Sequence, residues 1–476
     1  MSVVSMMARG EIKDHKNIYA VIIIVIGLTM TSFMLANAYQ QYMMQVVSDT
    51  TKTLLTSDVC VLADKQSIRS MYGTCPQLDN AQEIADEIAA KTGYKTAVRI
   101  SGAGTYNYNN SGYDGALLQG IDLKCDPEIE KIKSYIIEGT WFDENVDYLN
   151  HHKGFKVDSG TIVGNYSIPY VGSVSYEQPN PNDKPYPIIM GKATADNHKI
   201  KLGTVLGMPV TVSSQGTSIA SINVQVIGIY NSGLPALDGL VWFMPADCVR
   251  EFKGYGNQTG TALDTFINAY SFEVNKNIGD VIIVKTPESN AIEKLDPISH
   301  ANSIGSKVSD AVPGYTVYTW HDLIVYASGT MQDTITVMLW GTMAVTLILA
   351  GFAIKYVMDS IVMRKTREIG SLKAFGARDR TVLNIFLWQG AFIGVSSGIL
   401  GIVLAIVVMN LVSWYGLSIG FVGGTQLKID FVITELTLFA SFAVPIGVSL
   451  IAASIPAKRA AKLSPVEALR VGELAL

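Results

Sequence analysis

Residues 364–380 read RKTREIGSLKAFGARDR and lie between two long apolar runs. Ile369, Leu372 and Phe375 recur at spacings of three, which predicts that they share one face of a short helix. Gly376 follows, and a glycine can take the positive φ that ends a helix. The segment therefore predicts a helix, a tight turn and a second helix, and we interpret it as an elbow between two membrane helices.

The composition places part of the chain in lipid. The chain has 476 residues, of which only 16% are charged, and its mean hydropathy is +0.27. Charged residues make up about 25% of an average soluble domain. The formal net charge of −5 does not call for a nucleic-acid partner, because membrane topology and lipid explain the basic residues that flank the apolar runs.

Four apolar runs are long enough to cross a bilayer, which takes about 20 residues. We assign the four transmembrane helices to residues 18–38, 334–358, 382–414 and 432–456. Basic residues precede the first run, fill the elbow between the second and third, and follow the fourth. The connection between the third and fourth runs, residues 415–431, holds Lys428 as its single basic residue.

The positive-inside rule orients these helices, because short loops rich in Lys and Arg stay in the cytoplasm. We expect residues 1–17, 359–381 and 457–476 to be cytoplasmic, and residues 39–333 and 415–431 to be external. The sequence therefore predicts a multi-pass protein of the cell membrane with both termini in the cytoplasm.

Two alternatives stay open near the N-terminus. Residues 18–38 can be a cleaved signal peptide, because Ala36-Asn-Ala38 resembles a cleavage site. The run is longer than the usual apolar region of about 7–15 residues, however, and the large domain is external in either case. Residues 3–16 can be an interfacial amphipathic helix or a disordered basic tail.

Residues 39–333 are too long for a simple connection and predict an α+β domain. A helix pattern at 81–91 leads into a strand at 96–100. Residues 102–115 are rich in Gly, Asn and Tyr, which indicates a surface loop. We expect an inserted lobe at about 145–184. The predicted fold is a membrane protein with four transmembrane α-helices and a large α+β extracytoplasmic domain inserted between helices 1 and 2.

All four cysteines lie in the predicted external domain, at positions 60, 75, 125 and 248. An oxidising compartment favours disulfides, and four cysteines allow three pairings. The short separation of Cys60 and Cys75 makes them the preferred possible disulfide, and buried thiols are the alternative.

Signals for an enzyme are weak. The sequence contains no Gly-x-x-x-x-Gly-Lys-Ser/Thr loop, so this route to cradling ATP phosphates is excluded. His151 and His152 are adjacent in a predicted loop, and such a pair alone does not make a metal site. We expect no catalytic residue, no metal and no cofactor in this chain.

Two stretches carry a family resemblance. Residues 364–377 resemble the R-x-x-E-I-G-x-L-[KR]-A-x-G-A elbow of the FtsX-like permeases of ABC transporters, which include MacB-type exporters and lipoprotein-releasing permeases. Residues 456–470, PAKRAAKLSPVEALR, resemble the tail of the same family. Weaker matches at 189–203, 226–229 and 241–245 are similar to the periplasmic core domain of MacB-type permeases.

The resemblance implies a permease that works as a homodimer or heterodimer with a separate ABC ATPase subunit, which would hold the ATP and Mg²⁺. The elbow would be the coupling helix seated on that ATPase, or, in the alternative, an interfacial helix packed on lipid. The implied coupling residues are Arg367, Glu368, Ile369, Gly370, Leu372, Lys373, Phe375 and Gly376.

In this family, ATP-driven closure of the dimer moves the external domains without passing substrate through the bilayer, which is called mechanotransmission. The sequence agrees, because the apolar runs contain no convincing polar path. Small residues in the third run instead predict close helix packing at Gly390, Gly394, Gly398 and Gly401.

We therefore expect export or extraction of a hydrophobic or peptide-like substrate. The alternatives are a non-transporting transducer that regulates an extracellular partner enzyme, and a membrane receptor without an ATPase.

Overall fold

The computed structural model describes residues 16–463 with gaps at 73–74, 108–112, 147, 150–155, 158–160, 163–184, 212–218, 260–270, 288–295, 329–330 and 421–425. Most of the lobe expected at 145–184, nearly all of the predicted N-terminal segment 1–17 and the end of the tail beyond residue 463 lie outside the described residues. The chain divides into two compact units, and each is considered by itself.

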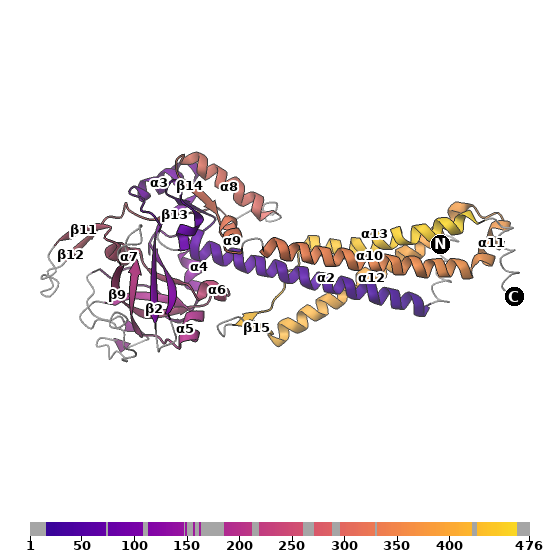
Figure 1. Ribbon diagram of the computed structural model, residues 1–476, viewed down its shortest axis with the longest axis horizontal. Helices are drawn as coiled ribbons and strands as arrows, with labels where there is room; N and C mark the ends of the chain where they lie inside the picture. The colour runs from indigo at the N-terminus through magenta and orange to yellow at the C-terminus, as the bar shows by residue number, and fades with distance from the viewer. Residues whose placement is uncertain are drawn as a thin grey trace. The chain divides into compact units, whose positions relative to one another are not determined.

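The first unit consists of Met1–Met44, Thr330–Leu417 and Ile429–Leu476 and is helical (Figure 1). Its long helices are α2 (Lys16–Thr51), α10 (Met331–Arg364), α12 (Asp379–Tyr415) and α13 (Glu435–Lys462). Each is long and apolar enough to cross a membrane. The first three predicted runs lie within α2, α10 and α12, and the fourth, 432–456, begins three residues before α13. Helices are expected here because lipid offers the backbone no hydrogen-bond partners, so every peptide group must be paired within its own segment.

Close contacts between α12 and α13 are made at three of the predicted glycines. A Cβ atom on Gly390 would lie 2.7 Å from the Cβ of Ala453, and one on Gly394 would lie 2.6 Å from the Cα of Ile446. The third, Gly398, also faces α13, but a Cβ there would lie 3.4 Å from Cγ of Pro445, which is an ordinary contact. The first two positions are the tight ones. These distances leave no room for side chains, so the helix backbones approach closely, as small residues allow in membranes.

The fourth glycine, Gly401, faces a different helix. A Cβ there would lie 2.6 Å from the Cβ of Met30 on α2. Helix α12 therefore contacts α13 and α2 through separate small-residue surfaces.

Buried hydrogen bonds add to this packing in the helical unit. The Tyr19 hydroxyl donates to Oε1 of Gln389 at 3.0 Å and joins α2 to α12. The Thr437 hydroxyl donates to Oδ1 of Asn37 at 2.6 Å and joins α13 to α2. Interhelical hydrogen bonds of this kind satisfy polar groups that would otherwise be unpaired in lipid.

The second unit, Gln45–Gly329 with Ser418–Lys428, is built on a ten-stranded sheet. The strand order is β14-β1-β13-β2-β3-β10-β7-β9-β4, and β8 pairs with β2 and β9. The strands are β1 (Val59–Leu62), β2 (Lys95–Asn107), β3 (Tyr113–Ile121), β4 (Ile136–Gly139), β7 (Pro185–Gly191), β8 (Val205–Thr211), β9 (Ile219–Tyr230), β10 (Val241–Pro245), β13 (Val281–Lys285) and β14 (Thr316–Thr319). The β3–β10 and β7–β9 pairs are parallel and the other pairs of this sheet are antiparallel.

Helices and short hairpins complete this unit. The helices are η1 (Lys52–Thr56, a π-helix), η2 (Ile68–Tyr72, a 3-10 helix), α3 (Ala81–Thr92), α4 (Ile129–Ser134), α5 (Lys192–His198), α6 (Pro235–Asp238), α7 (Ala246–Lys253), α8 (Pro297–Ala311) and α9 (Trp320–Ser328). The two-stranded pairs are β5 (Lys156–Val157) with β6 (Thr161–Ile162), β11 (Gly256–Thr259) with β12 (Ser271–Val274), and β15 (Ser418–Gly420) with β16 (Gln426–Lys428). Four transmembrane helices and an inserted α+β domain are thus confirmed.

The predicted helix at 81–91 is α3, and its apolar positions explain its placement. Ile84 and Ile88 lie four residues apart and are buried, so one face of the helix packs on the domain core. The helix ends at Gly93, which has φ +73°, a conformation that glycine adopts without steric cost.

The prediction of a surface loop at 102–115 is wrong for most of its length. Strand β2 continues to Asn107, β3 begins at Tyr113, and the two pair in antiparallel register. Glycines in a strand often mark the close approach of another element. Gly120 of β3 shows this, since a Cβ there would lie 2.9 Å from Cγ2 of Val249 on α7.

The structure does not contain the predicted Cys60–Cys75 disulfide. Both residues are fully buried in the main core of the domain, and both are thiols. The Cys60 thiol donates to Sδ of Met71 at 3.5 Å. Burial raises the pKa of Cys60 well above its usual value, which disfavours the thiolate that disulfide exchange requires.

The chain enters and leaves the sheet on neighbouring strands. Strand β1, which follows α2 and η1, pairs antiparallel with β14, which precedes α9 and α10. Val59 is opposite Thr319, and Leu62 is opposite Thr316. The two connections to the helical unit therefore start from one edge of the sheet.

Asp238 on α6 makes the stability of the domain depend on pH. It is 2% exposed, and it accepts hydrogen bonds from the Ser232 hydroxyl at 2.5 Å and the Ser232 N–H at 3.2 Å. Burial outweighs these bonds and raises the pKa of Asp238 to about 6. The folded state therefore holds this proton more tightly than the unfolded state, and the stabilisation is lost as the pH rises from about 4 to about 6.

We expect Asp238→Asn to remove this pH-dependent loss of stability. A pKa shift of about two units corresponds to at most roughly 3 kcal/mol of unfolding free energy. Thermal unfolding of the purified protein and of the variant should be recorded between pH 4 and pH 8. The melting temperature of the variant, relative to that of the wild type, should increase as the pH rises through 6. A difference between the two melting temperatures that does not change with pH would contradict the raised pKa of Asp238.

We expect Gly394→Ala to destabilise the helical unit, because its added methyl group would collide with the backbone of α13. Overpacking of this kind costs about 1–3 kcal/mol. Gly447→Ala is the matched control, since it lies on α13 and a Cβ there meets no atom within 4 Å. Thermal unfolding in one detergent should show a lower midpoint for Gly394→Ala alone, and equal midpoints would exclude the close contact.

Candidate functional site

The elbow predicted from the sequence is a short helix with a defined end. Helix α11 (Thr366–Ala374) lies between α10 and α12 in the chain. Gly376 follows it with φ +91°. The Gly376 N–H donates to the Lys373 carbonyl at 2.9 Å, and the Ala377 N–H donates to the Leu372 carbonyl at 3.1 Å. This pair of bonds is a Schellman motif, which fixes the direction in which the chain leaves the helix.

One face of α11 packs on the helical unit. Ile369 and Gly370 are buried, and Ile369 belongs to a core cluster formed with residues of α2, α10, α12 and α13. Leu372 is partly buried against the same cluster. These contacts hold α11 to the ends of the long helices.

Lys373 holds the elbow through polar contacts. Its Nζ donates to the carbonyl of Ala461 at 2.7 Å and to that of Leu463 at 2.8 Å. It also lies 2.9 Å from the carboxylate of Asp379 at the start of α12. A cation at these carbonyls satisfies groups that the end of α13 leaves unpaired and complements its dipole. Lys373 therefore joins α11, α12 and α13.

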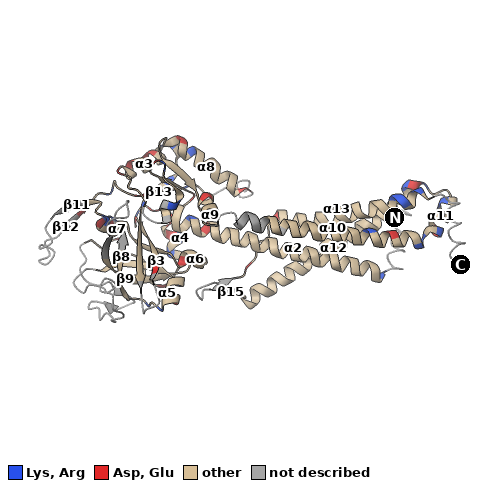
Figure 2. Cartoon of the chain, viewed as in Figure 1, with Lys and Arg blue, Asp and Glu red and all other residues tan. Residues whose placement is uncertain are grey.

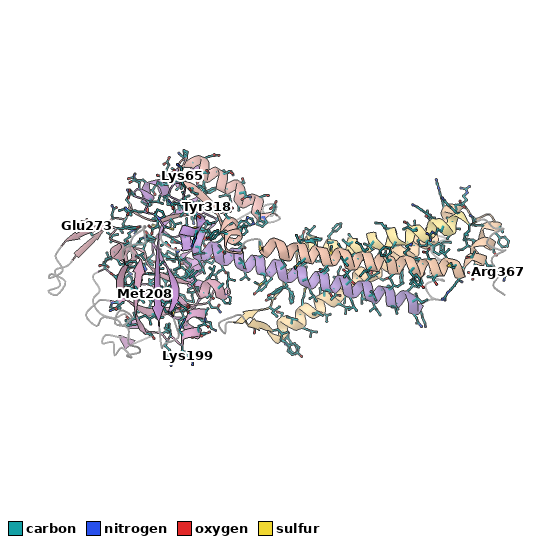
Figure 3. All side chains as sticks on the ribbon, viewed as in Figure 1. Lys65, Lys199, Met208, Glu273, Tyr318 and Arg367 are labelled. Atoms are coloured by element: carbon teal, nitrogen blue, oxygen red, sulfur yellow. The ribbon has the colours of Figure 1, made fainter. Side chains whose placement is uncertain are left out.

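The opposite surface of the elbow combines an exposed aromatic ring with positive charge. Phe375 is 93% exposed and Met363 is 77% exposed. The arginines of this region are also exposed, at positions 364, 367, 378 and 380. Figure 2 shows Lys and Arg positions, drawn in blue on the cartoon, gathered at this end of the helical unit, and Figure 3 labels Arg367. We call Met363, Phe375 and these four arginines the elbow surface.

The structure separates the residues that the spacing had placed on one face. Ile369 and Gly370 face the helices of their own chain, so they present no surface to a partner in this structure. Phe375 is the residue after the helix end, with φ −81° and ψ 10°, and it therefore leaves the face that Ile369 occupies. Glu368 is exposed and pairs with Lys365 at 2.8 Å.

Sequence reasoning missed two parts of the elbow. Met363 was assigned no role, although it precedes the elbow motif by one residue and is exposed beside it. Lys373 was expected on the surface, but its contacts with the end of α13 depend on residues about 90 positions away. Among the described residues, no group of three or more His, Cys, Asp or Glu residues could hold a metal ion.

Comparisons with known proteins find relatives for the part of the chain that contains the elbow. Residues 340–465 match the family model described as the FtsX-like permease C-terminal domain. The macrolide export ATP-binding/permease protein MacB of Brucella abortus is 32% identical over 139 residues, which are 29% of this chain and 20% of that protein. The pyoverdine export ATP-binding/permease protein PvdT of Pseudomonas syringae pv. tomato is 32% identical over 149 residues, which are 31% of this chain and 20% of that protein.

A third relative matches over a longer stretch. The uncharacterized ABC transporter permease MJ1507 of Methanocaldococcus jannaschii is 28% identical over 196 residues, which are 41% of this chain and 47% of that protein. This chain therefore spans about a fifth of the length of the MacB and PvdT proteins and about half of the archaeal permease.

A solved structure, the periplasmic region of MacB from Actinobacillus actinomycetemcomitans, aligns with 58% of this chain and 95% of its own, at 10% identity and a TM-score of 0.29. The residues that match the family model, 340–465, include the elbow helix α11, the helices α12 and α13, and most of α10. Residues 340–465 are therefore similar to the C-terminal domain of the FtsX-like permeases, and the relatives that share this similarity are ABC transporter permeases of the MacB and PvdT type.

Proposed function

We propose that this chain is the permease subunit of a dimeric ABC transporter, driven by a separate ATPase subunit that binds ATP and Mg²⁺. The observation that carries the proposal is the elbow surface, which lies within the residues that match the FtsX-like family. An exposed aromatic ring in a segment with several exposed arginines is typical of a protein interface, where aromatic residues and Arg dominate the binding energy. The elbow surface would bind the ATPase.

The proposed orientation places the elbow and both termini in the cytoplasm, because basic residues gather at the elbow end of the long helices. Trp414 and Tyr415 lie at the other end of α12 and are 78% and 70% exposed. Aromatic residues of this kind favour the interface between lipid and water. The α+β domain would then be extracytoplasmic, as in MacB-type relatives.

Movement of the external domains, and not passage through the bundle, fits the helices best. Within the predicted spans, the described side-chain bonds between long helices join neutral groups, as at Tyr19–Gln389 and Thr437–Asn37. The Arg459–Asp359 ion pair between α13 and α10 lies just outside the predicted spans. Glycines also bring α12 close to α13 and to α2, which leaves no hydrophilic path along those contacts. Intramembrane charges usually mark the route of a polar substrate. We therefore propose mechanotransmission, with export or extraction of a hydrophobic or peptide-like substrate.

Affinity purification of the tagged chain from its native membrane tests this proposal. A nucleotide-binding subunit and ATPase activity should be recovered together with a second permease copy. Recovery of an external enzyme whose activity depends on the complex, without transport by reconstituted vesicles, would instead favour a transducer. Recovery of this chain alone under conditions that preserve other ABC complexes would overturn the proposal.

We expect Phe375→Ala to weaken ATPase binding by about 30-fold, the effect of about 2 kcal/mol that a buried aromatic anchor contributes to an interface. Phe352→Ala is the matched control, because Phe352 is 63% exposed on α10 but lies within a predicted membrane span. Co-purification of the ATPase with each variant measures the effect. Leu372 is unsuitable for this test because it packs on the helical unit. If Phe375→Ala recovers as much ATPase as the wild type, the elbow surface is not the docking site.

A further inference from the structure

The chain changes conformation abruptly where the first long helix reaches the sheet. Helix α2 is continuous to Thr51 and is followed by the π-helix η1. The Ser57 N–H donates to the Lys52 carbonyl at 2.7 Å, and Ser57 has φ 53° and ψ −144°. π-Helical turns are rare and occur often at functional sites, and residues other than glycine seldom adopt such a backbone conformation. The surrounding structure must hold Ser57 in place.

Arg99 of β2 binds the end of this helix. Its side chain is fully buried, and its Nε and Nη2 donate to the Asp126 carboxylate at 2.7 and 3.1 Å. On its other side the guanidinium donates to the carbonyls of Leu54 at 3.0 Å and Thr53 at 3.3 Å. One planar cation thus connects β2, the segment at Asp126 and the last turn of the helix.

A second set of contacts ties the same turn to β13. The Ser57 hydroxyl donates to Oε1 of Glu128 at 2.7 Å. Lys285 of β13 lies 3.1 Å from Oε2 of the same carboxylate. Asp58 accepts hydrogen bonds from the N–H and the hydroxyl of Thr286 at 2.9 and 2.8 Å. Both oxygens of the Glu128 carboxylate therefore have a partner. Together with Arg99, these contacts fix the helix end to the adjacent strands β2 and β13.

We propose that Arg99 is a positioning residue that locks the end of the first membrane helix onto β2 and β13, so that a displacement of α2 is delivered to the sheet as one rigid movement. A buried ion pair is weak evidence for stability, because apolar residues often replace one without loss. The role of Arg99 instead follows from its hydrogen bonds to the Thr53 and Leu54 carbonyls, which hold the helix end against β2. This inference rests on the proposed ATP-driven movement of the external domain.

The domain contains a matched control for the test. Lys253 and Asp280 form a second buried ion pair at 2.5 Å, with side-chain exposures of 1% and 0%. In the described part of the chain this pair contacts residues outside η1: Lys253 also donates to the Ser101 carbonyl, and Asp280 accepts from the Tyr255 hydroxyl and the Ser101 N–H. The variants Arg99→Gln with Asp126→Asn and Lys253→Gln with Asp280→Asn each replace an entire pair and leave no unpaired charge.

The complex with its ATPase should be reconstituted in nanodiscs, and hydrogen exchange of β2 and β13 should be compared with and without ATP, Mg²⁺ and orthovanadate. We expect the Arg99/Asp126 variant to keep ATP hydrolysis within about twofold of the wild type and to lose the nucleotide-dependent change in exchange by at least tenfold. The Lys253/Asp280 variant should keep that change even if its melting temperature falls further. A wild-type response from the Arg99/Asp126 variant would overturn the proposal.

A measurement without nucleotide separates this inference from the proposed function. In the Arg99/Asp126 variant, the amides of η1 and Ser57 should exchange at least tenfold faster than in the wild type, while those of β2 remain protected. The Lys253/Asp280 variant should leave η1 unchanged. Unchanged exchange at η1 in the Arg99/Asp126 variant would refute the lock, whereas absence of any nucleotide response in the wild-type complex would refute only the proposed function.

Discussion

The antiparallel pairing of β1 with β14 determines how the external domain is attached to the chain. These strands follow the first membrane helix and precede the second, and they are neighbours at one edge of the sheet. Everything between them is an insertion whose ends meet. The entropic cost of closing such a loop grows only slowly with its length. A large domain can therefore be inserted while β1 and β14 remain paired.

The two units are stabilised by different interactions because they fold in different solvents. Apolar side chains gain little from packing on one another in lipid, so the helices depend on close backbone approach at glycines such as Gly394 and on neutral bonds such as Tyr19–Gln389. The external domain folds in water and buries a continuous apolar core. It can also enclose ion pairs such as Arg99–Asp126, since each charge there has several partners.

The elbow and the end of α2 are built on a common principle, in which a buried or half-buried cation binds the carbonyls at the C-terminal end of a helix. Lys373 does this for α13 and Arg99 does it for η1. Each contact leaves little freedom between the helix and the element that supplies the cation. Under the proposed function, such stiffness would be needed at both places, where force would enter the helices and where it would leave them.

The sequence by itself determined the four membrane helices, the inserted α+β domain and the small-residue character of the third span, because run length, flanking charge and glycine spacing are local properties. It also located the elbow by its motif. Only the tertiary structure decided that Ile369 faces inward while Phe375 faces outward, that β2 and β3 extend through a glycine-rich stretch, and that Arg99 reaches Thr53 and Leu54. These features depend on contacts between residues far apart in the chain, and no local pattern records which distant partner a side chain will meet.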